Sequence, residues 1–76
     1  MGRADGAIPQ KYRELIAIAV ACTTQCPYCI EAHVKAAKAA GVTREELVES
    51  AMIAAALRAG GAATHGAMAL KFFDKE

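Results

Sequence analysis

The chain has 76 residues and a mass of 7.9 kDa, so it forms at most one domain and buries only roughly 60% of its unfolded surface. Hydrophobic residues make up 55% of the sequence and aromatic residues only 5%, a composition that favours closely packed helices and excludes disorder. Nine Lys and Arg against eight Asp and Glu give a net charge of +1. This charge is too small to attract nucleic acid or an anionic membrane by a general electrostatic field.

The sequence carries no targeting or membrane signal that we can identify. No run of about 20 uncharged apolar residues is present, and residues 1–7 lack the apolar segment of a signal peptide. We therefore expect a cytoplasmic protein. In that compartment a close pair among the three cysteines indicates redox chemistry or metal binding more often than a structural disulfide.

The first predicted helix covers residues 9–23, after a flexible N-terminus of residues 1–8. Pro9 suits a first helical turn, and beyond Arg13 the helix is apolar on every side. A helix of this kind is predicted to be buried all round. Since a chain this short can hardly enclose it, we expect residues 9–76 to form a single helical domain that assembles into a homo-oligomer.

Two further helices are marked by clear local signals. Pro27 predicts a helix start with Cys26 near its cap, and Gly41 predicts the end of that helix at about residue 40. The segment from Thr43 to Glu46 is a capping box, which predicts a third helix over residues 44–59.

A fourth helix is predicted over residues 62–74. The pair Gly60 and Gly61 is expected to break or sharply bend the chain before it. No alternating strand pattern or repeat is present. The sequence therefore predicts an all-α fold of about four helices with short connections.

The main chemical feature is the segment from Cys26 to His33 at the start of the second predicted helix. Cys26, Cys29 and His33 are spaced i, i+3, i+7, which places both sulfurs and the imidazole on one narrow face. The positive end of the helix dipole stabilises a thiolate there, and His33 lies one turn beyond Cys29, where it can exchange a proton.

Other interpretations of the pair stay open at this point. Cys26 and Cys29 together with His33 and His65 would supply four zinc ligands, although three ligands on one helix lie along a line and do not surround a metal. The two thiols are also compatible with simple core packing. A c-type haem is excluded because position 30 is Ile, where that motif requires His.

Glu14 is the second unusual residue, because it leads into the apolar part of the first helix and an unpaired carboxylate there is costly. One interpretation is a first-turn glutamate favoured by the helix dipole. The other is a carboxylate that reaches the sulfur and imidazole face and moves protons with His33. Of the remaining candidates, Cys22 is expected to be a small core residue and His65 a packed or interface residue.

Glu14 followed by Cys26-x-x-Cys29-x-x-x-His33, inside an alanine-rich helical chain, resembles the active-site pattern of the carboxymuconolactone decarboxylase superfamily. The branch it resembles is the alkylhydroperoxidase D-like one, over about residues 8–74. This resemblance implies an all-helical antioxidant fold, usually a trimer or hexamer. It also implies reduction of hydrogen or alkyl peroxides, with electrons from a dihydrolipoyl or thioredoxin-like thiol and without a cofactor or metal.

The resemblance also assigns roles to the residues. It implies that Cys29 attacks the peroxide and becomes a sulfenic acid, that Cys26 resolves it to a disulfide, and that Glu14 and His33 relay protons. Helix-dipole reasoning alone favours Cys26 as the more acidic sulfur, whereas Cys29 is the cysteine within one turn of His33. In the best-known branch a histidine immediately precedes the second cysteine, and Tyr28 occupies that position here.

Overall fold

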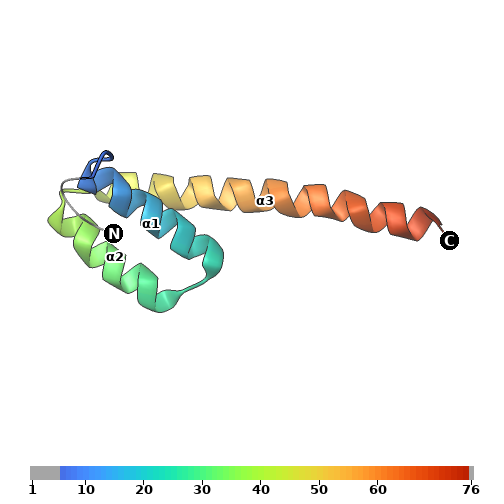
Figure 1. Ribbon diagram of the computed structural model, residues 1–76, viewed down its shortest axis with the longest axis horizontal. Helices are drawn as coiled ribbons and strands as arrows, with labels where there is room; N and C mark the ends of the chain where they lie inside the picture. The colour runs from blue at the N-terminus through green and yellow to red at the C-terminus, as the bar shows by residue number, and fades with distance from the viewer. Residues whose placement is uncertain (1–5, 76) are drawn as a thin grey trace.

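The computed structural model describes residues 6–75, and within that range it is all-helical and contains no strand. Its elements are α1 (Gln10–Thr24), α2 (Pro27–Ala39) and α3 (Arg44–Lys75). α1 packs against both α2 and the first part of α3, and the rest of α3 projects away from them (Figure 1). The expected flexible N-terminus falls mostly on residues 1–5, which lie outside the described residues.

The ends of α1 and α2 lie within one residue of the predicted positions, and local backbone chemistry explains them. Gln25 ends α1 in the left-handed conformation with φ 58°, and Cys26 then caps α2, with Pro27 in its first turn. Gly41 has φ +87°, a conformation that glycine adopts without steric cost. The predicted role of Gly41 in ending the second helix is therefore confirmed.

The capping box at the start of α3 is also confirmed. The Glu46 amide donates to Thr43 Oγ1 at 3.1 Å, and the Thr43 amide donates to Glu46 Oε1 at 2.9 Å. Glu46 Oε2 in addition lies 3.0 Å from Lys11 Nζ. The start of α3 is thereby tied to the first turn of α1.

The predicted break at Gly60 and Gly61 is wrong, so three helices replace the expected four. α3 runs without interruption from Arg44 to Lys75, and neither glycine of the pair has a positive φ. A glycine inside a helix costs about 1 kcal/mol relative to alanine but does not clash with the helix. The flanking alanines, which are strong helix formers, are sufficient to carry the helix through the pair.

The core of the single chain is small. Its buried side chains lie on one stripe of α1, at one position of α2 and at two positions of α3: Glu14, Ile18, Ala21, Ala37, Ser50 and Ala54. Beyond Ala54 every described residue of α3 is exposed, and the molecule is 55 Å long (Figure 1). No helix in the described range is long and apolar enough to cross a membrane.

The all-apolar surface of the first helix predicted burial on every side. Within one chain this burial is incomplete. Ile16 and Val20 are each about half exposed, on the side of α1 away from its buried stripe. The accessible surface of the chain is 5930 Å², whereas a compact monomer of this mass has about 4400 Å². The single chain is therefore less compact than a monomer of its mass usually is, and several of its large apolar side chains face water.

Candidate functional site

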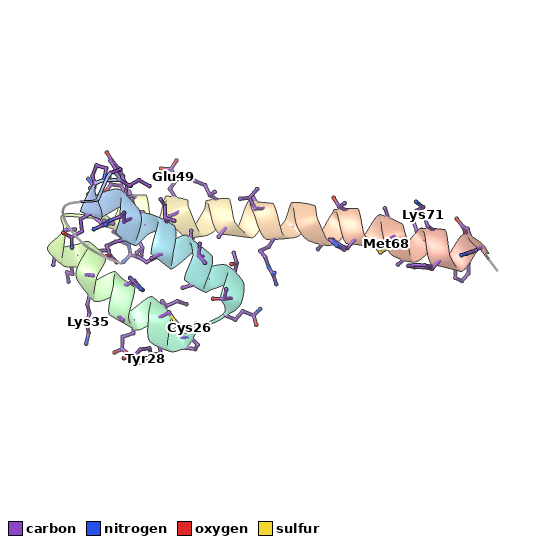
Figure 2. All side chains as sticks on the ribbon, viewed as in Figure 1. Cys26, Tyr28, Lys35, Glu49, Met68 and Lys71 are labelled. Carbon is purple, nitrogen blue, oxygen red and sulfur yellow. A yellow bond between two sulfur atoms is a disulfide. The ribbon has the colours of Figure 1, made fainter. Side chains whose placement is uncertain are left out.

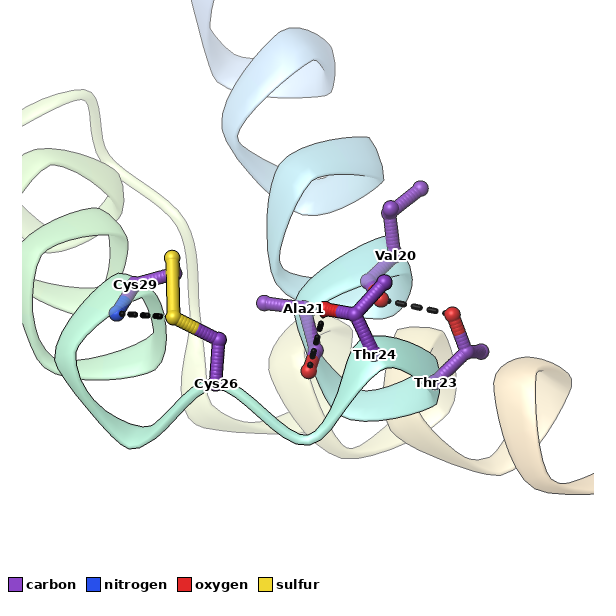
Figure 3. The surroundings of a disulfide bond; sticks show 6 residues. All are labelled: Val20, Ala21, Thr23, Thr24, Cys26 and Cys29. Atoms are coloured by element: carbon purple, nitrogen blue, oxygen red, sulfur yellow. Dashed lines mark hydrogen bonds between the residues drawn. A yellow bond between two sulfur atoms is a disulfide. The ribbon is translucent and has the colours of Figure 1, made fainter.

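The two cysteines of the motif lie at the start of α2 and are joined in a disulfide. Their Cα atoms are 5.3 Å apart, and the Cys29 amide donates a hydrogen bond to Cys26 Sγ at 3.2 Å. Cys26 thus caps the helix and is the bonded partner of Cys29. Figure 3 shows the pair opposite the last turn of α1, which carries Ala21 and Thr24.

Glu14 of α1 and His33 of α2 meet across the helix interface. Glu14 Oε1 lies 2.7 Å from His33 Nδ1, although the two residues are 19 positions apart in the sequence. The Glu14 side chain is 4% exposed and that of His33 28% exposed. Because Nδ1 is held by the carboxylate, Nε2 is the ring nitrogen left to exchange a proton with the surroundings.

An open cavity of about 360 Å³ lies between α1 and α2 and connects the two features. Cys29 and His33 line it from α2, and an apolar stripe of α1 that includes Ile16 and Val20 lines it from the other side. The sulfur and the imidazole therefore share one concave, mostly apolar surface. A concave apolar cavity with a few polar groups is the usual form of a small-molecule site.

Arg13 also lines this cavity, and the sequence analysis did not identify it as a site residue. Its Nε and Nη2 atoms are buried without a hydrogen-bond partner. The signal that could have identified it is its spacing, because Arg13 lies three residues before Ile16 and four before Ala17. Those positions fall on one helix face.

The other residues considered from the sequence lie elsewhere. Tyr28 is 81% exposed and points outward from α2, and it does not line the cavity (Figure 2). His65 is exposed on the projecting half of α3, where its Nδ1 is 3.0 Å from the Gly61 carbonyl oxygen. It therefore does not join Cys29 and His33. His65 is not packed within the single chain, and its place in an interface between chains stays a prediction.

Cys22 is half-buried and is a free thiol, near the expected core position but not fully enclosed. Between residues 6 and 75 no three side chains of His, Cys, Asp or Glu come together as a metal site requires. The four-ligand zinc site considered from the sequence thus gains no support from the geometry.

Comparison with known proteins gives the family. The sequence profile of the carboxymuconolactone decarboxylase family matches residues 1–72. The chain belongs to the carboxymuconolactone decarboxylase family.

Two relatives are similar in sequence to this member of the carboxymuconolactone decarboxylase family over most of its length. It is 49% identical over 72 residues to "Uncharacterized protein 4 in cox locus" of Paracoccus denitrificans, which covers 95% of this chain and 65% of the relative. It is 36% identical over 70 residues to an uncharacterized protein of Cupriavidus necator, covering 92% of this chain and 62% of the relative. The chain thus spans slightly less than two thirds of the length of each relative.

Proposed function

We propose that the protein is a thiol-dependent peroxidase, with Cys29 as the attacking thiol, Cys26 as the resolving thiol and the Glu14–His33 pair as the proton relay. The observation that carries the proposal is the 2.7 Å contact between Glu14 and His33. The imidazole of His33 lines the same cavity as Cys29 of the redox pair. A carboxylate that holds Nδ1 fixes the tautomer and leaves Nε2 for proton transfer.

The first step is attack of the Cys29 thiolate on the peroxide. An S–O bond forms as the O–O bond breaks, so that Cys29 is oxidised by two electrons to a sulfenic acid and the peroxide is reduced to an alcohol or water. His33 takes the proton of the Cys29 thiol and returns it to the leaving oxygen. The N-terminus of α2 stabilises the thiolate through the helix dipole.

The second step closes the disulfide. The Cys26 thiolate attacks Cys29 Sγ, and the sulfenic oxygen leaves as water after taking up a proton. A Cα separation of 5.3 Å is within the range that a disulfide spans, so no backbone movement is required. A dithiol reductant of the dihydrolipoyl or thioredoxin-like class then returns the pair to the reduced state and is itself oxidised to a disulfide.

Serine variants of the two cysteines test this assignment. In Cys26→Ser one equivalent of peroxide should be consumed and a sulfenic acid should accumulate at position 29, whereas Cys29→Ser should consume none. Mass spectrometry of both variants after one equivalent of peroxide measures this directly. Sulfenic acid on Cys26 in the Cys29→Ser protein would reverse the two roles.

Metal analysis of the same preparation provides the control for a different function. Stoichiometric zinc, with Cys26 and Cys29 protected from alkylation, would replace the peroxidase by a zinc-stabilised module. The absence of both zinc and peroxide-sensitive thiols would indicate a non-catalytic helical oligomerisation module.

A further inference from the structure

Arg13 is a cation of the cavity that the proposed peroxide chemistry does not use. Two of its guanidinium nitrogens, Nε and Nη2, are buried and have no hydrogen-bond partner within the part of the chain that the structure describes. Burying polar atoms of a charged group without partners costs free energy, and the guanidinium cannot lower this cost by losing its proton. A ligand that accepts hydrogen bonds from these nitrogens would remove the cost.

The walls of the cavity restrict the chemistry of that ligand. Apart from Arg13, Thr24 and the reacting groups on α2, the lining is aliphatic, with Ile8, Ile16 and Val20 as its large side chains. Hydrogen peroxide alone would leave both the aliphatic wall and the guanidinium without a partner. A volume of about 360 Å³ is instead suited to a small organic molecule.

The two polar ends of the cavity are separated along the helices. Arg13 is the neighbour of Glu14 on α1, and Glu14 contacts His33, so Arg13 belongs to the His33 end of the cavity. Cys29 lies one turn before His33 on α2. Four helical residues correspond to about 6 Å along the axis. A molecule with an acidic group at one end and a reactive group at the other therefore fits between Arg13 and Cys29, with its aliphatic part against α1.

We propose that the cavity binds an aliphatic hydroperoxide that carries a carboxylate, with the carboxylate paired to the Arg13 guanidinium and the hydroperoxide group at Cys29. This inference rests on the proposed peroxidase function and adds a substrate class to it. The planar guanidinium matches a carboxylate through two parallel hydrogen bonds, and Arg13, in the first turn of α1, also lies at the positive end of that helix. The chemical step is unchanged: Cys29 is oxidised to the sulfenic acid, and the hydroperoxy acid is reduced to a hydroxy acid.

Binding can be measured without peroxide turnover. The reduced protein is alkylated with iodoacetamide in the presence of octanoate or of octan-1-ol, and the modification rate of Cys29 is followed by mass spectrometry. We expect octanoate to protect Cys29 at concentrations at least tenfold lower than octan-1-ol. Charge-assisted hydrogen bonds are worth roughly 1.5–3 kcal/mol, which corresponds to a difference of about 10- to 100-fold.

Variants at position 13 identify the group that makes the difference. Arg13→Gln should weaken octanoate protection by about 10- to 100-fold and bring it close to that of octan-1-ol, while Arg13→Lys should retain part of it, because a lysine keeps the charge but not the planar fork. Lys35→Gln is the matched control, because Lys35 is an exposed cation on the outer side of α2 (Figure 2) and should leave protection unchanged. Circular dichroism checks that each variant is folded. If Arg13→Gln does not fold, Arg13→Lys still tests the proposal.

The results separate this inference from the proposed function. Equal protection by octanoate and octan-1-ol, or an affinity for octanoate that neither Arg13 variant changes by more than twofold, would overturn the carboxylate site. Consumption of hydrogen peroxide by the same preparation reports on the peroxidase function independently. Protection that depends on Arg13 without any peroxide consumption would therefore retain the site and overturn the peroxidase.

Discussion

Glu14 is almost completely removed from water, and within residues 6–75 its side chain bonds only to His33. A carboxylate in this position is favourable only when it is hydrogen-bonded, so the pair is a structural unit as well as the proposed proton relay. Glutamine has nearly the same shape as glutamate and keeps an oxygen that can accept from Nδ1. The charge can therefore be removed with little change to the packing.

We predict that Glu14→Gln slows the reaction of reduced protein with peroxide by ~10² to 10⁴, the usual contribution of a general acid–base group. His33→Ala should have an effect of the same size. Stopped-flow measurement of thiol loss gives the rate, and the thermal melting curve gives the stability. Glu31→Gln, on the exposed part of α2, is the control. A rate for Glu14→Gln within threefold of the parent protein would exclude the carboxylate from the relay.

The start of α3 combines a cap and an ion pair on one carboxylate. The hydrogen bond from the Thr43 amide, followed by that from the Lys11 ammonium, lowers the pKa of Glu46 below the usual range of a glutamate. A carboxyl group whose pKa is lower in the folded state stabilises the fold above its unfolded pKa. This stabilisation is lost as the pH falls through the folded pKa.

We predict that Glu46→Gln reduces the loss of stability as the pH falls below about 5, because glutamine keeps a cap acceptor but does not titrate. Chemical denaturation at several pH values measures this effect. Glu45→Gln removes the same charge from the preceding residue and should leave more of the acid dependence in place. If the two variants have the same pH dependence, the link between Glu46 and acid stability is wrong.

The helix starts and ends could be predicted from sequence because their signals are local. Pro27, Gly41 and the capping box each act within one turn, and the backbone follows them. The glycine pair in α3 gave the wrong result, because the tendency of two glycines to end a helix competes with many helix-forming neighbours, and sequence pattern does not show which effect is larger.

The candidate site divides in the same way. The face shared by Cys26, Cys29 and His33 follows from helical spacing alone, whereas the Glu14–His33 contact joins two helices and depends on how they pack. Spacing could not choose between a first-turn glutamate and a partner of His33. Arg13 was missed because the cavity that it lines forms only when α2 packs against α1, and this packing cannot be read from the pattern of α1 alone.

At the scale of the whole molecule, the chain exposes more surface than a compact monomer of its size does, and many of its large apolar side chains are exposed. The projecting half of α3 carries exposed Leu57, Leu70 and Phe73. Many large apolar side chains exposed on one segment indicate an interaction site. We propose that further copies of the chain cover it in a homo-oligomer, with a trimer or hexamer as the expected state.

We predict that light scattering at micromolar concentration gives the mass of several protomers. Leu70→Glu, on the projecting half of α3, should shift the mass toward that of one chain, because a charge buried in an apolar interface is costly. Lys71→Ala is the control at the neighbouring exposed position. A stable, well-folded monomer of the unchanged protein would contradict the proposal.

The disulfide of Cys26 and Cys29 closes a loop with only two residues between its ends, and this short loop limits the stabilisation that the cross-link gives. In the chain-entropy description, a cross-link over four residues restricts the unfolded chain by about 1.9 kcal/mol, less than half of the about 4.7 kcal/mol of a cross-link over 100 residues. Breaking this bond therefore lowers the stability of the fold by less than breaking a disulfide across a long loop would. The oxidised and reduced proteins can share one architecture, so each redox cycle can proceed without an accompanying cycle of unfolding.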